Sequence, residues 1–399
     1  MLPLHTHATV SGVSRNGIYK VLTPEEASSS AFDSSDVLVW MEDDKADNQA
    51  EFTQTAGFMY AGEATKKPDG AVVIENVRTG GVVAPGDVVA VQKDRSLITV
   101  LYRRGSTSNT LFATERCNSF CVMCSQPPRE VDDQWRVADM LNTIDLVDRD
   151  EPLLGMSGGE PTLLGDDLLV VLNHARRQLP ETGMHILSNG RRFVDARFAQ
   201  TVCGVRHPNV CWGIPLYSAS PEIHDYIVQA PGAWDETVAG LFNLARYGAS
   251  IELRVVVQKA NVEALSELAY FIFRNLTFVD HVAFMGLEPM GFARVNRDDV
   301  FIDPVDVAPS LQDAVHFLAN RGMKTSIFNI PICTLPNDLR PFAVRSISDW
   351  KNVYLPVCDG CDVQDECCGF FKSVGVDWLS RSVSPITLTM EAGDERQMA

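Results

Sequence analysis

From residue 110 onward, short apolar runs alternate with amphipathic stretches, and this alternation is the strongest constraint on the fold of the 399-residue chain. Successive runs begin about 30–40 residues apart, which fits strand–helix–strand units, because a parallel crossover needs roughly a dozen residues or more. Six such units predict an α/β fold with a parallel sheet curled into a full or partial barrel, whose active site lies at the carboxyl ends of the strands. The expected strands are residues 111–114, 153–157, 184–188, 212–217, 251–257 and 281–287.

Start and stop signals mark several helices expected between these strands. Asp235 precedes the amphipathic stretch ETVAGLFNLARY and Gly248 follows it, whereas Asn261 precedes VEALSELAYFIF. Pro304 opens a further stretch that ends before Gly322. Polar capping residues, a proline in the first turn and a glycine after the last turn are typical of helix ends.

The first hundred residues have a different pattern, with short β-like runs separated by turn signals such as Pro85-Gly86-Asp87. Residues 1–35 are polar, and we expect them to be irregular. The acidic stretch MEDDKADNQAE at 41–51 predicts a solvated loop. The expected strands are residues 36–40, 57–61, 71–76, 88–91 and 97–102.

These changes in pattern predict the domain organisation. Nothing in the β-rich part resembles a catalytic motif, whereas cysteines cluster at 117–124 and at 333–368. We therefore expect a small β-rich N-terminal domain at 1–108, a core at 109–300, a cysteine-rich C-terminal extension at 301–382 and a flexible tail at 383–399.

The charge balance limits the partners of the protein. Asp and Glu number 52 against 34 Lys and Arg, which gives a formal net charge of −18 at pH 7. Such a surface repels phosphate backbones, so nucleic acid is not expected as a partner. No apolar run reaches the roughly 18 residues that span a bilayer, and the first residues lack the pattern of a secretory signal. We expect a cytoplasmic protein with no membrane association.

The first cysteine cluster follows the first expected strand of the core. In a reducing compartment, clustered cysteines favour metal binding over disulfides. Cys117, Cys121 and Cys124 have C-x3-C-x2-C spacing. Three thiolates on one loop can hold three irons of a [4Fe–4S] cube and leave the fourth iron open to a small molecule. A zinc site or three unrelated core thiols are the alternatives, although zinc would require a further His or Cys nearby.

A glycine-rich segment follows the second expected strand of the core. Ser157-Gly158-Gly159-Glu160-Pro161 combines two glycines, which let a ligand approach the backbone closely, with a carboxylate suited to an ammonium group. Alone, this segment is a weak signal, because turns contain it by chance. At a second strand end, after a C-x3-C-x2-C loop, it becomes specific.

The two motifs together resemble the radical S-adenosylmethionine (SAM) superfamily. The resemblance covers about residues 110–300 and implies a partial (β/α)6 barrel there. The resemblance implies that the three cysteines hold a [4Fe–4S] cluster and that the amino and carboxyl groups of SAM chelate its open iron. It assigns the cluster ligands to Cys117, Cys121 and Cys124. It assigns SAM contacts to Gly158, Gly159 and Glu160. The residue before the third cysteine is commonly aromatic in the superfamily, whereas here it is Met123.

Further cofactor contacts are expected from their positions on the strands. Ser188 and Asn189 end the third expected strand of the core, and Tyr217 ends the fourth. Arg254 lies within the fifth strand, and its guanidinium fork suits a carboxylate. A turn cap or a structural hydrogen bond is the alternative role for each of these residues.

The second cysteine cluster lies in the C-terminal extension. Cys358, Cys361 and the pair Cys367-Cys368 form a C-x2-C-x5-C-C pattern, and Cys333 lies upstream of them. Four cysteines fully ligate either a second [4Fe–4S] cluster or a structural Zn2+, and the spacing does not separate the two. The superfamily resemblance favours iron–sulfur, because many members that modify peptides carry auxiliary clusters in C-terminal extensions.

A closer resemblance rests on the stretches LYRRGSTSNTLFATERCNSFCVMCSQPP (101–128), MSGGEPTLLGD (156–166), HILSNGR (185–191), GIPLYS (213–218), HDYIVQAPGAWDETVAG (224–240), VDHVAFMGLEPMGFARVN (279–296) and SISDWKNVYLPVCDGCDVQDECCGFF (346–371). These are similar to the HxsC family, the radical SAM maturases of His-Xaa-Ser peptide systems. The resemblance implies post-translational modification of a ribosomally made precursor peptide, with a second radical SAM protein in the same system. A glycine often stands at the position of Cys368 in that family, which assigns ligation to Cys367.

Two other functions stay open at the level of sequence. A radical SAM enzyme that acts on a small molecule or nucleotide would share the same core. A non-catalytic metal-binding scaffold could hold a precursor for a partner maturase, although the SAM-contact motifs argue against it. The catalytic reading additionally requires an electron donor, because SAM cleavage consumes one electron.

Overall fold

The computed structural model describes residues 4–12, 16–41, 52, 55–64, 71–77, 81–345 and 352–388. The chain divides into two compact units. Unit 1 comprises Met1–Cys117, Pro128–Ser188 and Arg197–Trp212, and unit 2 comprises Asn118–Pro127, Asn189–Ala196 and Gly213–Ala399. The domain boundaries expected at residues 108, 300 and 382 stay predictions. Residues 42–51 of the expected solvated loop and residues 389–399 of the expected tail lie outside the described residues.

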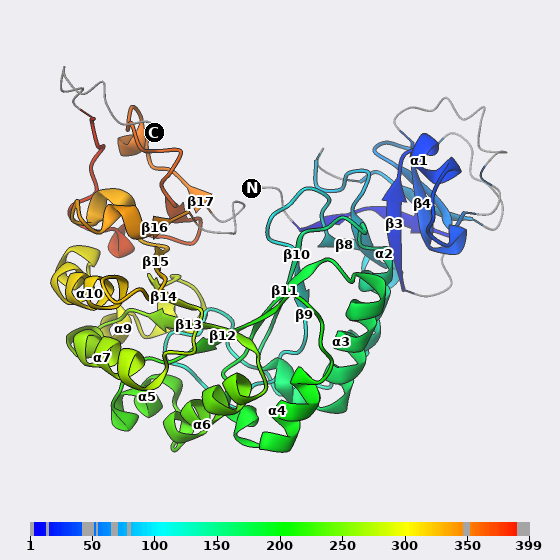
Figure 1. Cartoon of the computed structure of the whole chain (residues 1–399). Coiled ribbons are helices and arrows are strands. Elements are labelled where there is room, and N and C mark those ends of the chain that lie inside the picture. The colour runs from blue at the N-terminus through cyan, green and yellow to red at the C-terminus, as the bar shows by residue number, and fades with distance from the viewer. Residues whose placement is uncertain are drawn as a thin grey trace, which may run out of the picture. The chain divides into compact units, whose positions relative to one another are not determined.

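The N-terminal part of unit 1 is an eight-stranded sheet (Figure 1). β1 (His5–His7) and β2 (Thr9–Ser11) are separated only by Ala8, yet they pair with β8 and β6 at opposite ends of the strand order. This short segment therefore closes the sheet on itself, and closure removes the unpaired edges that an open sheet exposes. The order is β1-β8-β7-β3-β4-β5-β6-β2, with β3 (Gly17–Leu22), β4 (Val37–Met41), β5 (Gly57–Tyr60), β6 (Val72–Glu75), β7 (Val88–Gln92) and β8 (Leu97–Tyr102).

The strands expected between residues 36 and 102 are confirmed, but the expectation that residues 1–35 are irregular is wrong. This region contains β1, β2, the helix α1 (Pro24–Ser28) and β3, which pairs with both β4 and β7. The sequence GIYKVL conceals β3 because a lysine interrupts its apolar run. Lys20 is nonetheless fully buried, because it forms an ion pair with Asp148, a residue that lies far away in the chain.

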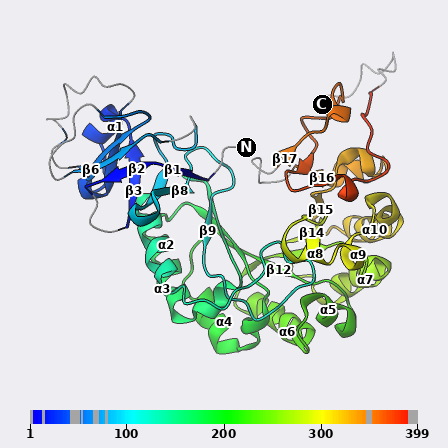
Figure 2. The ribbon, with the colours of Figure 1, turned by 180° about the vertical axis from the view of Figure 1, so that it is seen from behind.

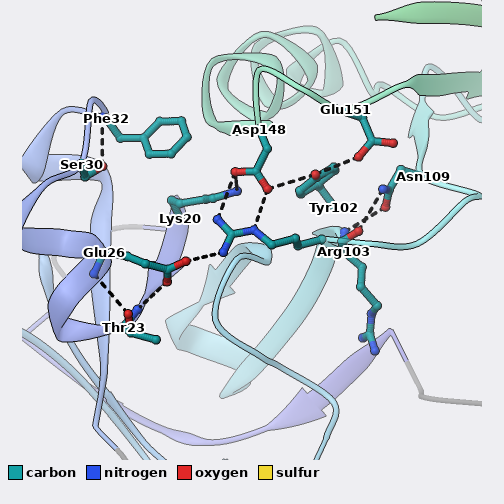
Figure 3. A network of polar contacts seen from close by, with 11 residues as sticks. Lys20, Thr23, Glu26, Ser30, Phe32, Tyr102, Arg103, Asn109, Asp148 and Glu151 are labelled. Carbon is teal, nitrogen blue, oxygen red and sulfur yellow. Dashed lines mark hydrogen bonds and ion pairs between the residues drawn. The ribbon is translucent and has the colours of Figure 1, made fainter.

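Lys20 belongs to a charged network that connects the N-terminal sheet to the segment before β10 (Figure 3). Its Nζ lies 2.8 Å from Asp148 Oδ1 in an ion pair. Arg104 Nε donates to Asp148 Oδ2 at 2.8 Å and also pairs with Glu26. Burial lowers the pKa of Lys20, while Asp148 acts in the opposite direction. The N-terminal sheet is therefore held to Asp148 by paired charges, of which Lys20 is fully removed from water.

The second sheet has its strands in chain order, from β9 to β16. The pairs of known register are parallel, as in Gly155↔Thr110 between β10 and β9 and Leu253↔Val282 between β13 and β14. All six expected strands of the core are present, and two later strands, β15 and β16, continue the same order. The bounds are β9 (Thr110–Phe112), β10 (Leu153–Ser157), β11 (Gly183–Leu187), β12 (Val210–Pro215), β13 (Ser250–Val256), β14 (His281–Met285), β15 (Thr325–Phe328) and β16 (Ala343–Val344).

Helices connect these strands, as the alternating pattern predicts. In unit 2, helices α5, α6, α7 and α10 lie on the outer side of β12–β15, as the view from behind shows (Figure 2). Within the part of the chain that the structure describes, no helix has both the length and the apolar character of a membrane span. The helices are α2 (Trp135–Leu146), α3 (Asp166–Gln178), α4 (Ala196–Cys203), α5 (Pro221–Val228), α6 (Ala233–Arg246), α7 (Leu265–Asn275), α8 (Gly291–Val295), α9 (Arg297–Val300) and α10 (Pro304–Ala319).

The two faces of β13 show how this sheet is packed. Ile251, Leu253 and Val255 are fully buried, whereas the alternate residues Glu252 and Arg254 are only partly buried. Because successive side chains of a strand point to opposite faces, the apolar set and the charged set lie on opposite faces of the sheet. Beyond β16, the C-terminal extension contains one small antiparallel pair, β17 (Asn352–Val353) and β18 (Phe370–Phe371).

Removing the carboxylate of Asp148 should cost more stability than replacing Lys20 with an apolar residue. Asp148→Ala strands a buried ammonium, and we expect it to lower the free energy of unfolding by about 3–5 kcal/mol. Lys20→Met should cost less than about 2 kcal/mol, because Asp148 keeps Arg104 and some contact with water. Urea unfolding monitored by circular dichroism measures both values. A Lys20→Met variant as unstable as Asp148→Ala would contradict this account.

Candidate functional site

In unit 1, the glycine-rich segment runs along the backbone that leads into the first cysteine. Gly159 N–H donates to Thr114 O at 2.7 Å, and Glu160 N–H donates to Arg116 O at 2.8 Å. A Cβ on Gly158 would lie 2.5 Å from Thr114 O, and one on Gly159 would lie 2.1 Å from Arg116 O. Gly158 also has a positive φ of 140°. Only glycine permits this close backbone approach, which places the segment beside the residues directly before Cys117.

Glu160 and Ser188, both expected to contact the cofactor, lie together in unit 1. Glu160 is fully buried, and its Oε1 accepts hydrogen bonds from Thr162 N–H at 3.0 Å, from Thr162 Oγ1 at 2.6 Å and from Ser188 Oγ at 2.8 Å. Three donors on one carboxylate oxygen fix the orientation of the whole group. Its role toward a cofactor stays a prediction.

Asp133 is a buried carboxylate that the sequence reading missed. It accepts hydrogen bonds from Thr114 Oγ1 at 2.9 Å, from Glu115 N–H at 2.6 Å and from Arg116 Nε at 3.2 Å. Burial alone would raise the pKa of Asp133, but these donors hold it below its usual range. The carboxylate therefore clamps the segment that enters the cysteine loop. No local pattern around residue 133 distinguishes it from an ordinary surface aspartate.

In unit 2, the loop that carries Cys121 and Cys124 is braced by neighbouring helices. Val122 N–H donates to Ile227 O at 2.9 Å in α5, and Phe292 N–H in α8 donates to Cys124 O at 2.8 Å. Met123 is buried in an apolar cluster with residues of these helices. This is the position before the third cysteine, which is commonly aromatic in the superfamily that the motifs resemble. The loop is thus ordered by backbone hydrogen bonds and apolar packing contributed by this chain alone.

The cysteines of the first cluster form no disulfides, and all three are partly buried. Burial raises the pKa of the Cys124 thiol, which donates to Gln126 O at 3.0 Å. Cys117 belongs to unit 1, whereas Cys121 and Cys124 belong to unit 2. Their assignment as ligands of one cluster stays a prediction.

Arg191 clamps the start of the same loop within unit 2, and the sequence reading missed it. Its guanidinium binds Asn118 O and donates to Ser119 Oγ at 3.1 Å, while its Nε donates to Glu236 Oε2 at 2.6 Å. Asn189, an expected cofactor contact, instead donates from Nδ2 to Asn118 Oδ1 at 2.6 Å. Both residues therefore hold the loop, and a direct role of Asn189 toward SAM stays a prediction.

Tyr217, another expected contact, is buried beside His224 in unit 2. The two rings stack with centroids 5.5 Å apart, and Tyr217 N–H donates to His224 Nδ1 at 3.2 Å. Asn261 Nδ2 donates to Tyr217 O at 3.0 Å. Burial lowers the pKa of His224 to about 4, which keeps Nδ1 an unprotonated acceptor at neutral pH. The segment after β12 is thus fixed by a neutral histidine and an amide.

Arg254 is engaged in an ion pair, so it is not a free guanidinium in this structure. Its Nη1 donates to Glu252 Oε1 at 2.6 Å on the same face of β13. Glu252 Oε2 lies 3.0 Å from His281 Nδ1, and His281 Nε2 lies 2.9 Å from Ser326 Oγ. This arrangement matches the structural alternative considered for Arg254. A contact with a cofactor carboxylate stays a prediction.

The cysteines of the second cluster all lie in unit 2, and several of them influence one another. Burial raises the pKa of the Cys333 thiol, and the neighbouring Cys367 and Cys358 raise it further. A hydrogen bond from Cys368 lowers the pKa of Cys367 to about 6, whereas the same bond and burial raise the pKa of Cys368 well above its usual value. Cys367 is therefore the better thiolate of the pair.

The described part of the expected tail begins beside this cluster. Ile386 N–H donates to Cys361 Sγ at 3.3 Å, and Leu388 N–H donates to Asp362 Oδ2 at 2.7 Å. Among the described residues, no group of three or more His, Cys, Asp or Glu side chains is arranged to hold a metal ion. The ligand sets of both clusters stay predictions, including Cys333, Cys358, Cys361 and Cys367 in the second.

Comparison with known proteins finds matching solved structures but no sequence family. No family model matches the chain, and no curated protein matches it. Among solved structures, Streptococcus suis SuiB bound to S-adenosylmethionine is 14% identical, with 57% of this chain and 50% of SuiB covered at a TM-score of 0.43. The matched part thus spans half the length of SuiB.

Two further solved structures are similar over a comparable part of the chain. For anSMEcpe with bound AdoMet, the identity is 15%, the match covers 55% of this chain and 62% of that one, and the TM-score is 0.43. A domain of the pyruvate-formate lyase-activating enzyme from Bacteroides vulgatus is 14% identical, with 43% of this chain and 96% of that domain covered at a TM-score of 0.35.

The low pKa of His224 makes a specific contribution to acid sensitivity. Its pKa is about 4 in the folded chain against an ordinary value of 6.5, so the unfolded chain binds the proton first as pH falls. Stability associated with His224 is therefore complete above pH 6.5 and is lost as pH falls toward 4, by up to about 3 kcal/mol. We expect His224→Asn to lose less stability than the parent between pH 7 and pH 4 in urea unfolding. Equal losses would remove His224 as the cause.

Proposed function

We propose that this protein is a radical SAM enzyme that reductively cleaves SAM and modifies a ribosomally made peptide of the His-Xaa-Ser type. The observation that carries the proposal is the contact of Gly158–Glu160 with the backbone of Thr114–Arg116, directly before Cys117. A Gly-Gly-Glu-Pro turn that occurs by chance is not expected to lie along the residues that lead into a cysteine loop. The contact supports treating the two motifs as parts of one site.

The donor set fits an iron–sulfur cluster in its chemistry. Cys117, Cys121 and Cys124 form no disulfide, and cysteine thiolates are the ligands that such clusters require. The glycines at 158 and 159 are required by close packing against the backbone of Thr114 and Arg116, directly before the first cysteine. When bound, such a cluster supplies one electron to the sulfonium of SAM, which yields methionine and a 5′-deoxyadenosyl radical that abstracts hydrogen from the substrate.

The protein's own residues would bind and orient the substrate of that step. Glu160 is proposed to accept hydrogen bonds from the ammonium group of SAM. Thr162 and Ser188 would hold the carboxylate in one orientation, which reduces the entropy lost when the ligand binds. Asp133 and Arg191 are proposed as positioning residues, because each binds the backbone or side chains at one end of the cysteine loop.

The substrate class rests on the stretches similar to the HxsC family. They extend over both cysteine clusters and over the segments after several strands, so they are not confined to the shared radical SAM motifs. A precursor peptide, a partner radical SAM protein and an electron donor are the proposed partners. The cytoplasm is the proposed location, because reduced clusters and free thiols require a reducing compartment.

We further propose that Cys333, Cys358, Cys361 and Cys367 hold a second [4Fe–4S] cluster, with Zn2+ as the alternative. The low pKa of Cys367 supports this choice, because the thiolate is the form that ligates metal. Cys368 is buried and retains its proton more strongly. It is therefore better suited to donate a hydrogen bond to Cys367 than to ligate the metal.

Anaerobic reconstitution followed by addition of dithionite and SAM should yield 5′-deoxyadenosine, detected by liquid chromatography and mass spectrometry. The triple variant Cys117→Ala/Cys121→Ala/Cys124→Ala should give only background. Glu160→Gln should weaken SAM binding by about 10–100-fold without loss of iron, because a charged hydrogen bond becomes neutral. Glu151→Gln, another buried carboxylate of unit 1, is the matched control. Product formation by the triple variant would reject the proposal.

Metal analysis separates the two readings of the second cluster. Two cubes correspond to roughly eight irons per chain, whereas one cube and a structural zinc correspond to roughly four irons and one zinc. We expect Cys367→Ser to lose about half of the iron and Cys368→Ser to retain it. The reverse pattern would reassign the fourth ligand to Cys368, and no change in either variant would argue against this ligand set.

A further inference from the structure

A small cavity lies in unit 2 where strands of the parallel sheet meet the C-terminal extension. Its volume is about 80 Å3. One wall is formed by residues directly after β13, β14 and β15, including Val257, Leu287 and Ile330. The carboxyl ends of parallel strands are where α/β folds place their ligands. The cavity is therefore on the edge of the sheet at which a substrate is expected.

The C-terminal extension forms the opposite wall, which is mostly apolar. Phe370, Val374 and Trp378 line the cavity from this side. Trp378 is held in place by an edge-to-face contact with Phe301, with ring centroids 5.2 Å apart. On the strand side, a Cβ on Gly286 would lie 2.4 Å from Asn329 O, so the backbone there is closely packed. Fixed aromatic rings and close backbone packing make this a preformed space.

Among the residues that the structure describes, one polar group at this cavity has no hydrogen-bond partner. Asn352 Nδ2 is buried, and no hydrogen-bond acceptor faces it among the residues that the structure describes. The hydroxyls of Thr334 and Ser380, which also line the cavity, already donate to Pro331 O at 2.8 Å and to Asp303 Oδ1 at 2.5 Å. Buried polar groups are nearly always hydrogen-bonded, so an unsatisfied amide beside an empty apolar space calls for an acceptor from a ligand.

The size of the cavity limits the apolar group that fits. An apolar cavity of about 150 Å3 accepts benzene, a ring of six carbons. A cavity of about half that volume admits roughly three or four carbons, as in valine, leucine or isoleucine, and excludes an aromatic ring. A peptide supplies a carbonyl acceptor immediately beside each side chain, whereas a hydrocarbon tail does not.

We infer that this cavity binds an aliphatic side chain of a peptide and that Asn352 donates a hydrogen bond to an adjacent peptide carbonyl. The inference deepens the proposed function and rests on it for the identity of the peptide as substrate. The occupant would be held by the C-terminal extension against the carboxyl ends of β13–β15. The extension thereby contributes to substrate recognition and not only to metal binding.

Calorimetric titration of the full-length reconstituted protein with N-acetyl-leucine N-methylamide tests the cavity. We expect this probe to bind about 10–50-fold more tightly than the alanine analogue, because about three more carbons are buried. The tryptophan analogue should give no detectable binding. Equal affinity for the leucine and alanine probes, tighter binding of the tryptophan probe, or no binding of any probe would overturn the inference.

Three variants localise the binding. Val374→Phe fills the cavity and should weaken binding of the leucine probe at least tenfold. Val376→Phe, at a position that is 88% exposed, should leave the affinity for this probe unchanged. Asn352→Asp replaces the donor with an acceptor of the same shape and should weaken binding about tenfold or more. Unchanged binding in both Val374→Phe and Asn352→Asp would overturn the site. If Val374→Phe does not fold, as judged by circular dichroism, Asn352→Asp decides alone.

The titration contains neither SAM nor a reductant, so its outcome is independent of the proposed cleavage reaction. A protein that binds the leucine probe but forms no 5′-deoxyadenosine keeps the cavity and loses the proposed function. A protein that cleaves SAM but does not discriminate among the probes keeps the function and loses the cavity.

Discussion

The backbone contact between Gly158–Glu160 and Thr114–Arg116 is the constraint on which the candidate site depends. Parallel pairing of β9 with β10, in the register Ser157↔Phe112, brings both strand ends to the same edge of the sheet. The chain then runs so close that a Cβ at Gly159 would lie 2.1 Å from a carbonyl oxygen. Because both segments are fixed to each other, the entrance of the cysteine loop and the buried carboxylate of Glu160 have one common support.

Buried charges reinforce this support, both beside the proposed chemistry and in the N-terminal part of unit 1. Asp133 holds the backbone before Cys117, and Asp148 anchors Lys20 and Arg104 of the N-terminal sheet. A buried ion pair adds little net stability compared with apolar packing, but removing one partner leaves a charge that is very costly. These pairs therefore specify which segments meet, and the closed N-terminal sheet is attached to the rest of unit 1 through such a pair.

The C-terminal extension contributes strands, cysteines and a cavity wall to unit 2. β15 and β16 continue the parallel sheet, and the residues after β17 carry cysteines that influence the pKa of Cys333. The same extension supplies Trp378 and Phe370 to the cavity at the strand ends. The proposed metal ligands and a wall of the inferred substrate cavity thus lie on one continuous segment. Ordering of this segment and formation of the cavity are expected to depend on each other.

The sequence by itself determined the six core strands, the helices between them and the two cysteine clusters, because these follow from local apolar periodicity and short-range spacing. It failed at β3, where a buried lysine interrupts the apolar run, and at Asp133 and Arg191, which look like ordinary charged residues. Their partners lie far away in the chain, as Lys20 does from Asp148 and Arg191 from Asn118. Only the tertiary structure decided these pairings, because the free energy of burying a charge depends on a partner that folding alone brings within reach.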